Sequence, residues 1–325
     1  MRIVRHHAFG APDVLRVEEA PRPEPGAGQV LIRTEAVGVN FAECQRRQGI
    51  PVGGPATLPG SPGGDVAGVV EALGEGVSEV SVGDRVVTGA PFDAYAEYVV
   101  ARADWLFPVP ESIDAAQATS MPIPAQTAYH VIATAARLAR GESMLITAAA
   151  GGIGHLLVQL GKALGAGRVI AAAGSAAKLD FVRGLGADVA INYTDEDWDE
   201  QVRAATDGRG ADVVLETVGG DILRRSVGLI APFGRMVVYG TAGGELPAVE
   251  IADIFDNRTV MGFSMWGVMA HRPQEMADGA KALLDLVGSG RVSPVIHARI
   301  PLDRAGAAHA LMEARSQLGR VVLVP

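Results

Sequence analysis

Cysteine is nearly absent from this sequence: Cys44 is the only one among 325 residues. The chain therefore cannot form an intramolecular disulfide, and it cannot supply the four thiolates of a Cys₄ zinc site. It also lacks an uninterrupted apolar run of about 18 residues, which a membrane-spanning helix requires. The first residues lack the apolar run of a signal peptide. We therefore expect a soluble, cytoplasmic protein.

Basic clusters are missing as well. The chain has 28 basic and 37 acidic residues, a formal net charge of −9, and no more than two Lys or Arg in adjacent positions. A nucleic-acid binder concentrates positive charge against phosphates, so this balance argues against one. With 48% apolar and 20% charged residues, the composition is that of a folded protein. We expect a small-molecule substrate, with neither nucleic acid nor membrane as a partner.

The pattern of short strands and helices changes along the chain. The first 120 residues are rich in glycine, proline and β-branched runs, which predict strands at 30–34, 65–70, 85–87 and 94–100. A helix-like stretch follows over 120–138. Strands at 143–148, 168–173, 189–191, 212–216, 235–239 and 259–261 then alternate with helices at 153–165, 176–185, 198–206 and 220–230. This alternation is typical of a doubly wound parallel sheet. A further helix at 274–287 precedes a last strand at 320–324.

A glycine-rich loop follows the first strand of the alternating region. In the G-x-G-x-x-G frame, Ala149 takes the first glycine position, and Gly151 and Gly154 take the second and third. The second glycine allows close approach to a pyrophosphate, and the third allows the helix to pack on the strand. A helix amino terminus also favours an anion. The loop predicts a dinucleotide site, the alternative being a Gly/Ala-rich helix start.

An acidic residue is missing where an NAD-binding protein usually carries one. The strand at 168–173 runs into Gly174 and Ser175, with Lys178 one turn later, and no Asp or Glu ends the strand. An acid at this position would hold the ribose hydroxyls of NAD. A small residue with a hydroxyl group instead leaves room for a 2′-phosphate, and Lys178 supplies a positive charge for it. We therefore expect NADPH as the cofactor, the alternative being that Lys178 is an ordinary solvated lysine.

Short motifs extend along nearly the whole chain. They are FGAPDVL (9–15), GVN (38–40), PGGDVAG (62–68), VGDRV (82–86), YAEY (95–98), AAAGGIG (148–154), LGAD (185–188), INY (191–193) and TVGG (217–220). Together they resemble the medium-chain dehydrogenase/reductase superfamily, specifically its zinc-free quinone oxidoreductase-like branch. The resemblance implies a β-rich, chaperonin-10-like catalytic domain from residues 1–122 and 292–325. A Rossmann domain over 123–291 stands between these segments, with residues 265–291 assignable to either domain.

The resemblance also implies a set of cofactor-binding residues. In NADPH-using members, residues equivalent to Ser175, Lys178 and Tyr193 hold the 2′-phosphate, although Tyr193 could instead be ordinary strand packing. The whole expected set is Asn40, Thr127, Ala150, Gly151, Gly152, Ile153, Gly174, Ser175, Lys178, Tyr193, Val218, Tyr239, Gly240, Phe263 and Arg320.

Zinc-using members differ at two matched positions. They carry a catalytic Cys where Asn40 stands and a Gly-His-Glu run where Gly63, Gly64 and Asp65 stand. Since neither thiolate nor imidazole remains, we expect no metal. Chemistry without a Lewis acid suits conjugated substrates such as quinones and enones. Asn40 is the candidate catalytic residue, because its amide could donate to a developing enolate oxygen. The alternative is a turn-forming asparagine.

Two features leave the substrate open. Tyrosines that quinone oxidoreductases often carry are replaced by Gln45 and Pro51, and no general acid is evident, so that solvent would protonate the product. One alternative is an enoyl thioester reductase, with Arg46 and Arg47 as the only nearby basic pair for the thioester's phosphates. The other is a non-enzymatic NADPH-binding protein.

The last strand of the alternating sheet is apolar and would otherwise be an exposed edge. Relatives join two such edges across a two-fold axis. We therefore expect a homodimer built mainly on residues 255–266, with Trp266 near the seam. If the chain is monomeric, Phe263 and Trp266 would instead line the substrate pocket.

Overall fold

The computed structural model describes residues 1–89 and 93–325, which form two compact units. Unit 1 comprises Met1–Ile123 and Pro294–Pro325, and unit 2 comprises Pro124–Ser293. The sequence analysis expected boundaries after residues 122 and 291, which lie one and two residues before the boundaries between these units. Residues 265–291 fall in unit 2. No helix in the described part of the chain is long and apolar enough to cross a bilayer.

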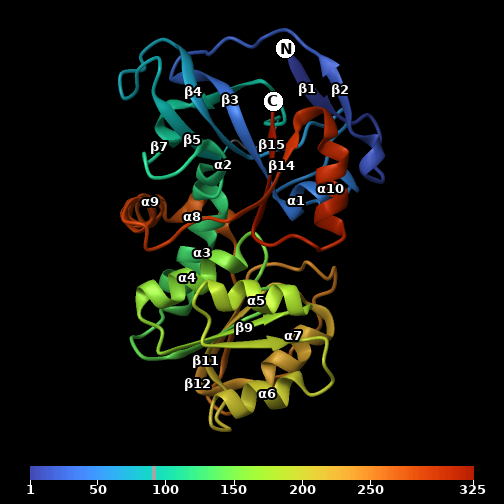
Figure 1. Ribbon diagram of the computed structural model, residues 1–325, viewed down its shortest axis with the longest axis vertical. Helices are drawn as coiled ribbons and strands as arrows, with labels where there is room; N and C mark the ends of the chain where they lie inside the picture. The colour runs from blue at the N-terminus through green and yellow to red at the C-terminus, as the bar shows by residue number, and fades with distance from the viewer. Residues whose placement is uncertain (90–92) are drawn as a thin grey trace. The chain divides into compact units, whose positions relative to one another are not determined.

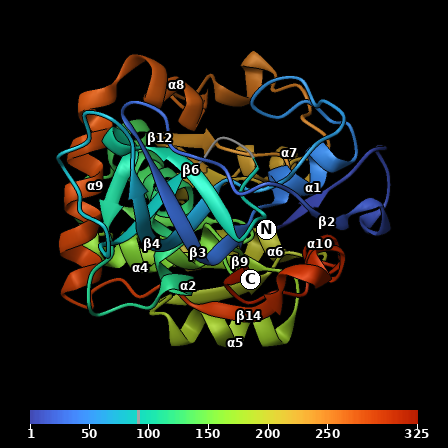
Figure 2. The ribbon, with the colours of Figure 1, turned by 90° about the horizontal axis from the view of Figure 1, so that it is seen from above.

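Unit 1 is built on a seven-stranded sheet in which the carboxyl-terminal tail pairs with the amino-terminal part. The order is β14-β15-β3-β4-β5-β7, with β6 paired to β3, and β1 and β2 form a separate pair. Figure 2 shows β3 beside β4 and β6. The strands are β1 (Arg2–Arg5), β2 (Arg16–Glu19), β3 (Gln29–Val39), β4 (Asp65–Leu73), β5 (Arg85–Gly89), β6 (Tyr98–Arg102), β7 (Leu106–Pro108), β14 (Ile296–Pro301) and β15 (Arg320–Val324).

Unit 1 also contains helices that the sequence analysis did not predict. They are α1 (Phe41–Arg47) and α10 (Ala305–Glu313), which pack against each other, and the short α2 (Ala115–Ala118). The sequence analysis predicted the strand at 320–324 in the tail but no helix before it, and the structure adds α10. Its small residues gave no strong helical periodicity, yet it buries Ala308, His309 and Met312.

Unit 2 contains a six-stranded parallel sheet in the order β10-β9-β8-β11-β12-β13. This is the 3-2-1-4-5-6 order of a Rossmann fold, which confirms the doubly wound prediction. The strands are β8 (Ser143–Ile146), β9 (Arg168–Ala173), β10 (Val189–Asn192), β11 (Ala211–Glu216), β12 (Ile230–Val238) and β13 (Thr259–Gly262). The helices α4 (Gly154–Leu164), α5 (Ala176–Gly184), α6 (Trp198–Ala205) and α7 (Gly220–Val227) connect them (Figure 1).

The helix-like stretch expected over 120–138 is helical over 121–136. It consists of α3 (Gln126–His130) flanked by the π-helical turns η3 (Met121–Ala125) and η4 (Val131–Ala136). Pro122 and Pro124 lack amide hydrogens, so a regular ladder cannot run through this stretch. After β13, the structure contains α8 (Met265–His271), which the sequence analysis did not predict, followed by α9 (Pro273–Gly288).

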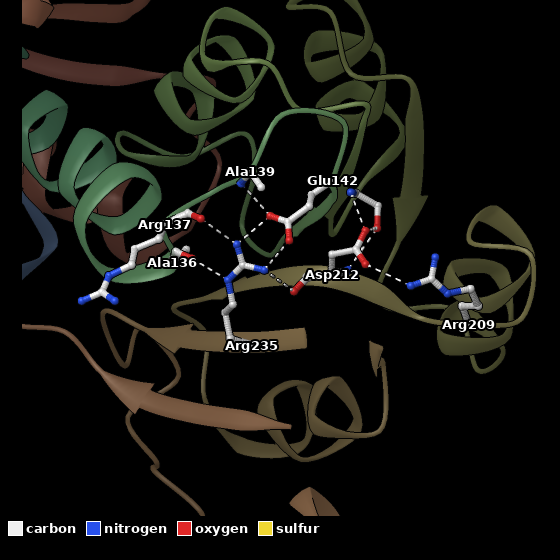
Figure 3. A network of polar contacts seen from close by, with 8 residues as sticks. Ala136, Arg137, Ala139, Glu142, Arg209, Asp212 and Arg235 are labelled. Carbon is white, nitrogen blue, oxygen red and sulfur yellow. Dashed lines mark hydrogen bonds and ion pairs between the residues drawn. The ribbon is translucent and has the colours of Figure 1, made fainter. Parts of the chain in front are cut away.

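A polar network fastens the amino-terminal edge of this sheet (Figure 3). The Arg235 guanidinium donates to both carboxylate oxygens of Glu142, at 2.7 and 2.6 Å, and to the carbonyl oxygens of Ala136 and Arg137. The Asp212 carboxylate accepts from the backbone amide and hydroxyl of Ser143, at 2.8 and 2.7 Å. These contacts join the starts of β8 and β11 to the middle of β12. At the opposite edge, the carboxyl-terminal ends of the strands lead into loops.

Candidate functional site

The expected cofactor residues of unit 2 gather at the carboxyl-terminal edge of its sheet. Because all six strands are parallel, the loops that follow them share this edge. Residues 150–153 follow β8, residues 174–178 follow β9, Tyr193 follows β10, Val218 follows β11, residues 239–240 follow β12 and Phe263 follows β13. Thr127 instead lies on α3, where its side chain is buried. The sheet thus brings together predictions that are far apart in sequence.

The glycine-rich loop shows why two of its residues are glycines. A Cβ on Gly154 would lie 2.7 Å from the backbone of Ala149 and would overlap the carbonyl oxygen of Ala148. A Cβ on Gly151 would meet only that carbonyl, at 3.3 Å. The third glycine is therefore required by the protein's own packing. The second leaves an open surface beside the start of α4, and a helix amino terminus favours an anion.

The corner after β9 carries hydroxyl and ammonium groups. Ser175 is the N-cap residue of α5, but its side chain makes no capping hydrogen bond, and Lys178 stands in the helix's first turn, which has no acidic residue. The Tyr193 ring packs over Gly174, since a Cβ there would lie 3.1 Å from the ring. Strands β9 and β10 are paired, which places Tyr193 beside this corner. These groups can hold an anion, and no carboxylate of the helix's first turn opposes it.

A buried carboxylate shapes the loop after β11. Glu216 is fully buried and accepts hydrogen bonds from the backbone amides of Val218 at 2.7 Å and Gly219 at 3.1 Å. Burial raises the pKa of this carboxyl, while the amide donors oppose the rise. The backbone amide of Tyr239 donates to the Glu216 carbonyl oxygen at 2.9 Å, which ties the loop after β12 to the same residue. Val218 is therefore held in place from within the sheet.

Unit 1 contains a buried ion pair beside Asn40. Arg320 donates to Asp65 Oδ2 at 2.6 Å, to Asn40 Oδ1 at 2.9 Å and to Thr119 Oγ1 at 3.1 Å. Arg320 is 2% exposed and Asp65 is fully buried. A Cβ on Gly38 would overlap the guanidinium, so the glycine makes room for it. Burial raises the pKa of Asp65, and the Arg320 charge opposes this rise.

The Asn40 amide is already used within the protein. Its Nδ2 atom donates to Asp65 Oδ2 at 2.7 Å and to Glu43 Oε1 at 3.1 Å. Both amide hydrogens are therefore engaged within unit 1, and the expected donation from Asn40 to a substrate oxygen stays a prediction. The Arg320 guanidinium likewise donates hydrogen bonds to three residues of the protein. Its expected contact with the cofactor stays a prediction.

These residues do not fit a zinc ion. Zinc needs three or four well-placed nitrogen, sulfur or oxygen ligands, and the matched positions offer Asn40, Gly64 and Asp65. The Arg320 guanidinium, a fixed cation, already bonds the oxygens of Asn40 and Asp65. Throughout residues 1–89 and 93–325, no three His, Cys, Asp or Glu side chains are grouped as a metal site would need.

A chain of buried side chains runs inward from Asn40, and the sequence analysis missed it. The Asn40 backbone amide donates to Glu43 Oε2 at 2.7 Å, and this same oxygen lies 3.0 Å from the Tyr95 hydroxyl. The hydroxyl in turn lies 3.0 Å from His309 Nε2. The Asn-x-x-Glu spacing, a helix-start signal, could have revealed α1 and Glu43. Nothing local in the sequence links these residues to His309.

The two arginines considered for a thioester's phosphates are also occupied. Arg46 donates to the carbonyl oxygens of Val52, Gly54 and Pro55. Arg47 is fully buried, pairs with Glu313 and donates to the carbonyl oxygen of Gly10. The basic pair that the enoyl thioester alternative required is therefore engaged in holding unit 1 together.

Comparison with known proteins places this geometry in a family. Residues 26–111 match the model of the alcohol dehydrogenase GroES-like domain, and residues 152–290 match that of zinc-binding dehydrogenases. A 2-haloacrylate reductase from a Burkholderia species is 35% identical, with 98% of this chain and 97% of that protein covered. The rat quinone oxidoreductase is 32% identical, with 100% and 98% covered.

Solved structures agree with the sequence relatives. The Escherichia coli quinone oxidoreductase complexed with NADPH has a TM-score of 0.92 at 30% identity, with both chains fully covered. A mycobacterial protein complexed with NADPH also has a TM-score of 0.92, at 33% identity and full coverage of both chains. The chain therefore belongs to the medium-chain dehydrogenase/reductase superfamily, in its quinone oxidoreductase-like branch.

Proposed function

We propose that this protein is an NADPH-dependent oxidoreductase that reduces a quinone or an α,β-unsaturated carbonyl compound without a metal ion. The observation that carries the proposal is the corner after β9. There Ser175 leaves α5 uncapped, Lys178 stands one turn on, and Tyr193 packs beside them. Solved relatives hold NADPH, which agrees with a site suited to a 2′-phosphate.

Each part of the carboxyl-terminal edge has a task in binding. The open surface at Gly151 and the start of α4 would receive the pyrophosphate. Ser175, Lys178 and Tyr193 would hold the 2′-phosphate, and Glu216 keeps the loop at Val218 in position. When bound, NADPH supplies a hydride.

The substrate class follows from what the site lacks. Arg320 bonds the oxygens of Asn40 and Asp65, which supports a reaction in which no metal ion polarises a carbonyl group. The substrate must delocalise the incoming electron pair itself, as a conjugated acceptor does. The named relatives are a 2-haloacrylate reductase and quinone oxidoreductases, whose names denote acceptors of this kind.

An oxidation screen tests this proposal. The purified protein would be mixed with NADPH or NADH and with quinones, enones, 2-haloacrylates and enoyl thioesters, and cofactor absorbance would be followed. We expect turnover with NADPH and at least one quinone or enone, no loss to chelators, and no stoichiometric zinc by elemental analysis. Turnover of enoyl thioesters alone would contradict the substrate class. Tight NADPH binding without any turnover would favour a non-enzymatic role.

We also propose that the protein forms a homodimer through β13. This strand ends the six-stranded order, so its outer edge pairs with no strand in the described part of the chain. Met261 on it is 37% exposed, and Phe255 and Trp266 nearby are 84% and 46% exposed. A second copy would cover these apolar side chains and the open edge. Sedimentation at micromolar concentration should show a dimer and Met261→Lys a monomer, whereas a monomeric wild type would refute the interface.

A further inference from the structure

The strand order of unit 2 reverses between β8 and β11, the two central strands of its sheet. In a sheet of this order a dinucleotide lies across the carboxyl-terminal edge at the reversal, with one nucleotide over each half of the sheet. Ser175, Lys178 and Tyr193, the groups suited to the 2′-phosphate of the adenosine nucleotide, follow β9 and β10. The nicotinamide nucleotide therefore belongs to the other half, over the ends of β11, β12 and β13.

Glu216 ends β11 at this reversal, and its side chain reaches the end of β8. Its Oε1 atom lies 3.3 Å from the Thr147 hydroxyl, which itself accepts from the backbone amide of Thr217 at 3.2 Å. Oε1 also accepts from the backbone amide of Val218 at 2.7 Å. Both carboxylate oxygens accept from the backbone amide of Gly219, at 3.1 and 3.2 Å. The carboxylate thus joins the residue after β8 to the loop that begins the nicotinamide half.

The hydrogen-bond partners of Glu216 favour its ionised form. The backbone amides of Val218 and Gly219 can only donate, and together they bond both carboxylate oxygens. A proton on the carboxyl group would compete with these amide hydrogens, so the donors stabilise the carboxylate. Burial acts in the opposite direction and raises the pKa of this group. The tests below are therefore set at pH 8.

The charge of Glu216 is not balanced by a cation. Glu216 is 0% exposed, is the only buried acidic residue among the described residues of unit 2, and forms no ion pair with any of them. The buried cluster of unit 1, formed by Asn40, Glu43, Asp65 and Arg320, differs because Arg320 pairs with Asp65 at 2.6 Å. The nicotinamide half of the edge therefore lies beside a fixed negative charge that is shielded from water.

The loop after β12 has a polar group left for a ligand in the same half. Thr241 Oγ1 is buried without a hydrogen-bond partner among the described residues. A Cβ on Gly219 would lie 3.6 Å from this hydroxyl, so Thr241 stands beside the backbone that Glu216 holds. A buried hydroxyl without a partner is unfavourable, and a ligand that bonds it removes that cost. This supports a polar ligand next to the loop at Gly219.

We propose that the Glu216 carboxylate favours the oxidised over the reduced cofactor, which makes bound NADPH a stronger hydride donor; this rests on the proposed NADPH-dependent function. When a hydride, a proton with two electrons, passes to the acceptor, the neutral nicotinamide ring becomes positively charged. A buried negative charge attracts the oxidised ring and has no net charge to attract in the reduced one. Glu216 is thus a positioning residue that also sets the balance between the two cofactor forms.

Dissociation constants of NADP⁺ and NADPH at pH 8, measured by calorimetric titration, separate the charge of Glu216 from its structural role. Glu216→Gln keeps the side-chain shape without the charge, so NADP⁺ should lose roughly tenfold more affinity than NADPH. Glu216→Asp keeps the charge on a shorter side chain, so any loss should be the same for both forms. The matched control, Glu200→Gln, removes the same charge from an exposed position on α6 and should change neither constant.

Infrared difference spectra of the NADPH and NADP⁺ complexes add a measurement that does not need Glu216→Gln to fold. A carboxylate stretching band should shift between the two complexes of the wild type, and Glu216→Asp should move this band and so assign it. A carboxylate band that is the same in both complexes, or a wild-type ratio of the two constants in Glu216→Gln, would overturn the inference alone. If the wild type binds neither nucleotide, the proposed function fails and the inference fails with it.

Discussion

The carboxyl-terminal edge of unit 2 and the buried cluster of unit 1 use opposite means to handle charge. The edge relies on backbone amides and on space: Gly151 leaves an open surface for an anion, and Gly154 allows the loop to pack against the start of α4. The cluster relies on ionised side chains in a dry environment, where Arg320 and Asp65 neutralise each other. Substitutions that add side-chain volume should therefore weaken cofactor binding at the edge of unit 2. Substitutions that remove a charge should destabilise the cluster of unit 1.

The largest expected effect comes from removing the buried cation. Arg320→Met leaves the buried Asp65 carboxylate without its cation, which should lower the free energy of unfolding by about 3–5 kcal/mol. The matched control is Arg299→Met, which removes an arginine from an ion pair with Asp114 whose side chains are 50% and 53% exposed. The control should cost no more than about 1 kcal/mol. Urea unfolding of both variants checks this, and equal losses would contradict the claim that burial makes the cluster depend on charge.

The next effect is a pH dependence of stability in unit 1. The pKa of Glu43 is about 7 in the folded protein and near its ordinary value when unfolded. A raised pKa in the folded state contributes stability at low pH that is lost as pH rises through 7. Between pH 5 and 8 this loss should be about 2–3 kcal/mol. Urea unfolding of Glu43→Gln should lack this part of the wild-type pH dependence; an unchanged curve would show that Glu43 is not protonated in the fold.

Substitutions of the two loop glycines should have different effects, one mainly on protein stability and the other mainly on NADPH binding. Gly154→Ala forces the backbone at Ala148 and Ala149 to shift, which should lower the free energy of unfolding by about 1–3 kcal/mol. Gly151→Ala meets only one carbonyl oxygen, so its stability should stay within about 0.5 kcal/mol of wild type. Its methyl group should nevertheless weaken NADPH binding at least about tenfold by obstructing the pyrophosphate. Thermal unfolding and fluorescence titration measure the two effects, and equal destabilisation by both would refute the distinction.

The same comparison explains what the sequence could and could not predict. Each expected cofactor residue of the edge follows a strand whose apolar run is visible locally, and the parallel order then brings the loops together. The buried cluster joins Asn40 to Arg320 and Glu43 to His309 across most of the chain. These contacts depend on β15 pairing with β3 and on α10 packing against α1. No local pattern carries that information.

Local details also have physical causes. The helix-like stretch expected over 120–138 is helical over 121–136, and it begins as a π-helical turn that contains Pro122 and Pro124, which cannot donate hydrogen bonds. Asn40 was expected to face a substrate, and only its side-chain partners, Asp65, Glu43 and Arg320, show that its amide hydrogens are committed. The sequence identified the residue as important but could not assign its contacts.

The most direct test of the account is the affinity of the edge for the 2′-phosphate. Dissociation constants of NADPH and NADH would be measured by fluorescence titration for wild type, for Lys178→Ala and for Lys281→Ala, which removes the same charge from an exposed position on α9. Losing a charged contact costs about 1.5–3 kcal/mol, so Lys178→Ala should bind NADPH roughly 10- to 150-fold more weakly. Its NADH affinity and both affinities of Lys281→Ala should stay at wild-type values. Equal weakening of NADPH and NADH in Lys178→Ala, or wild-type preference for NADH, would contradict the account.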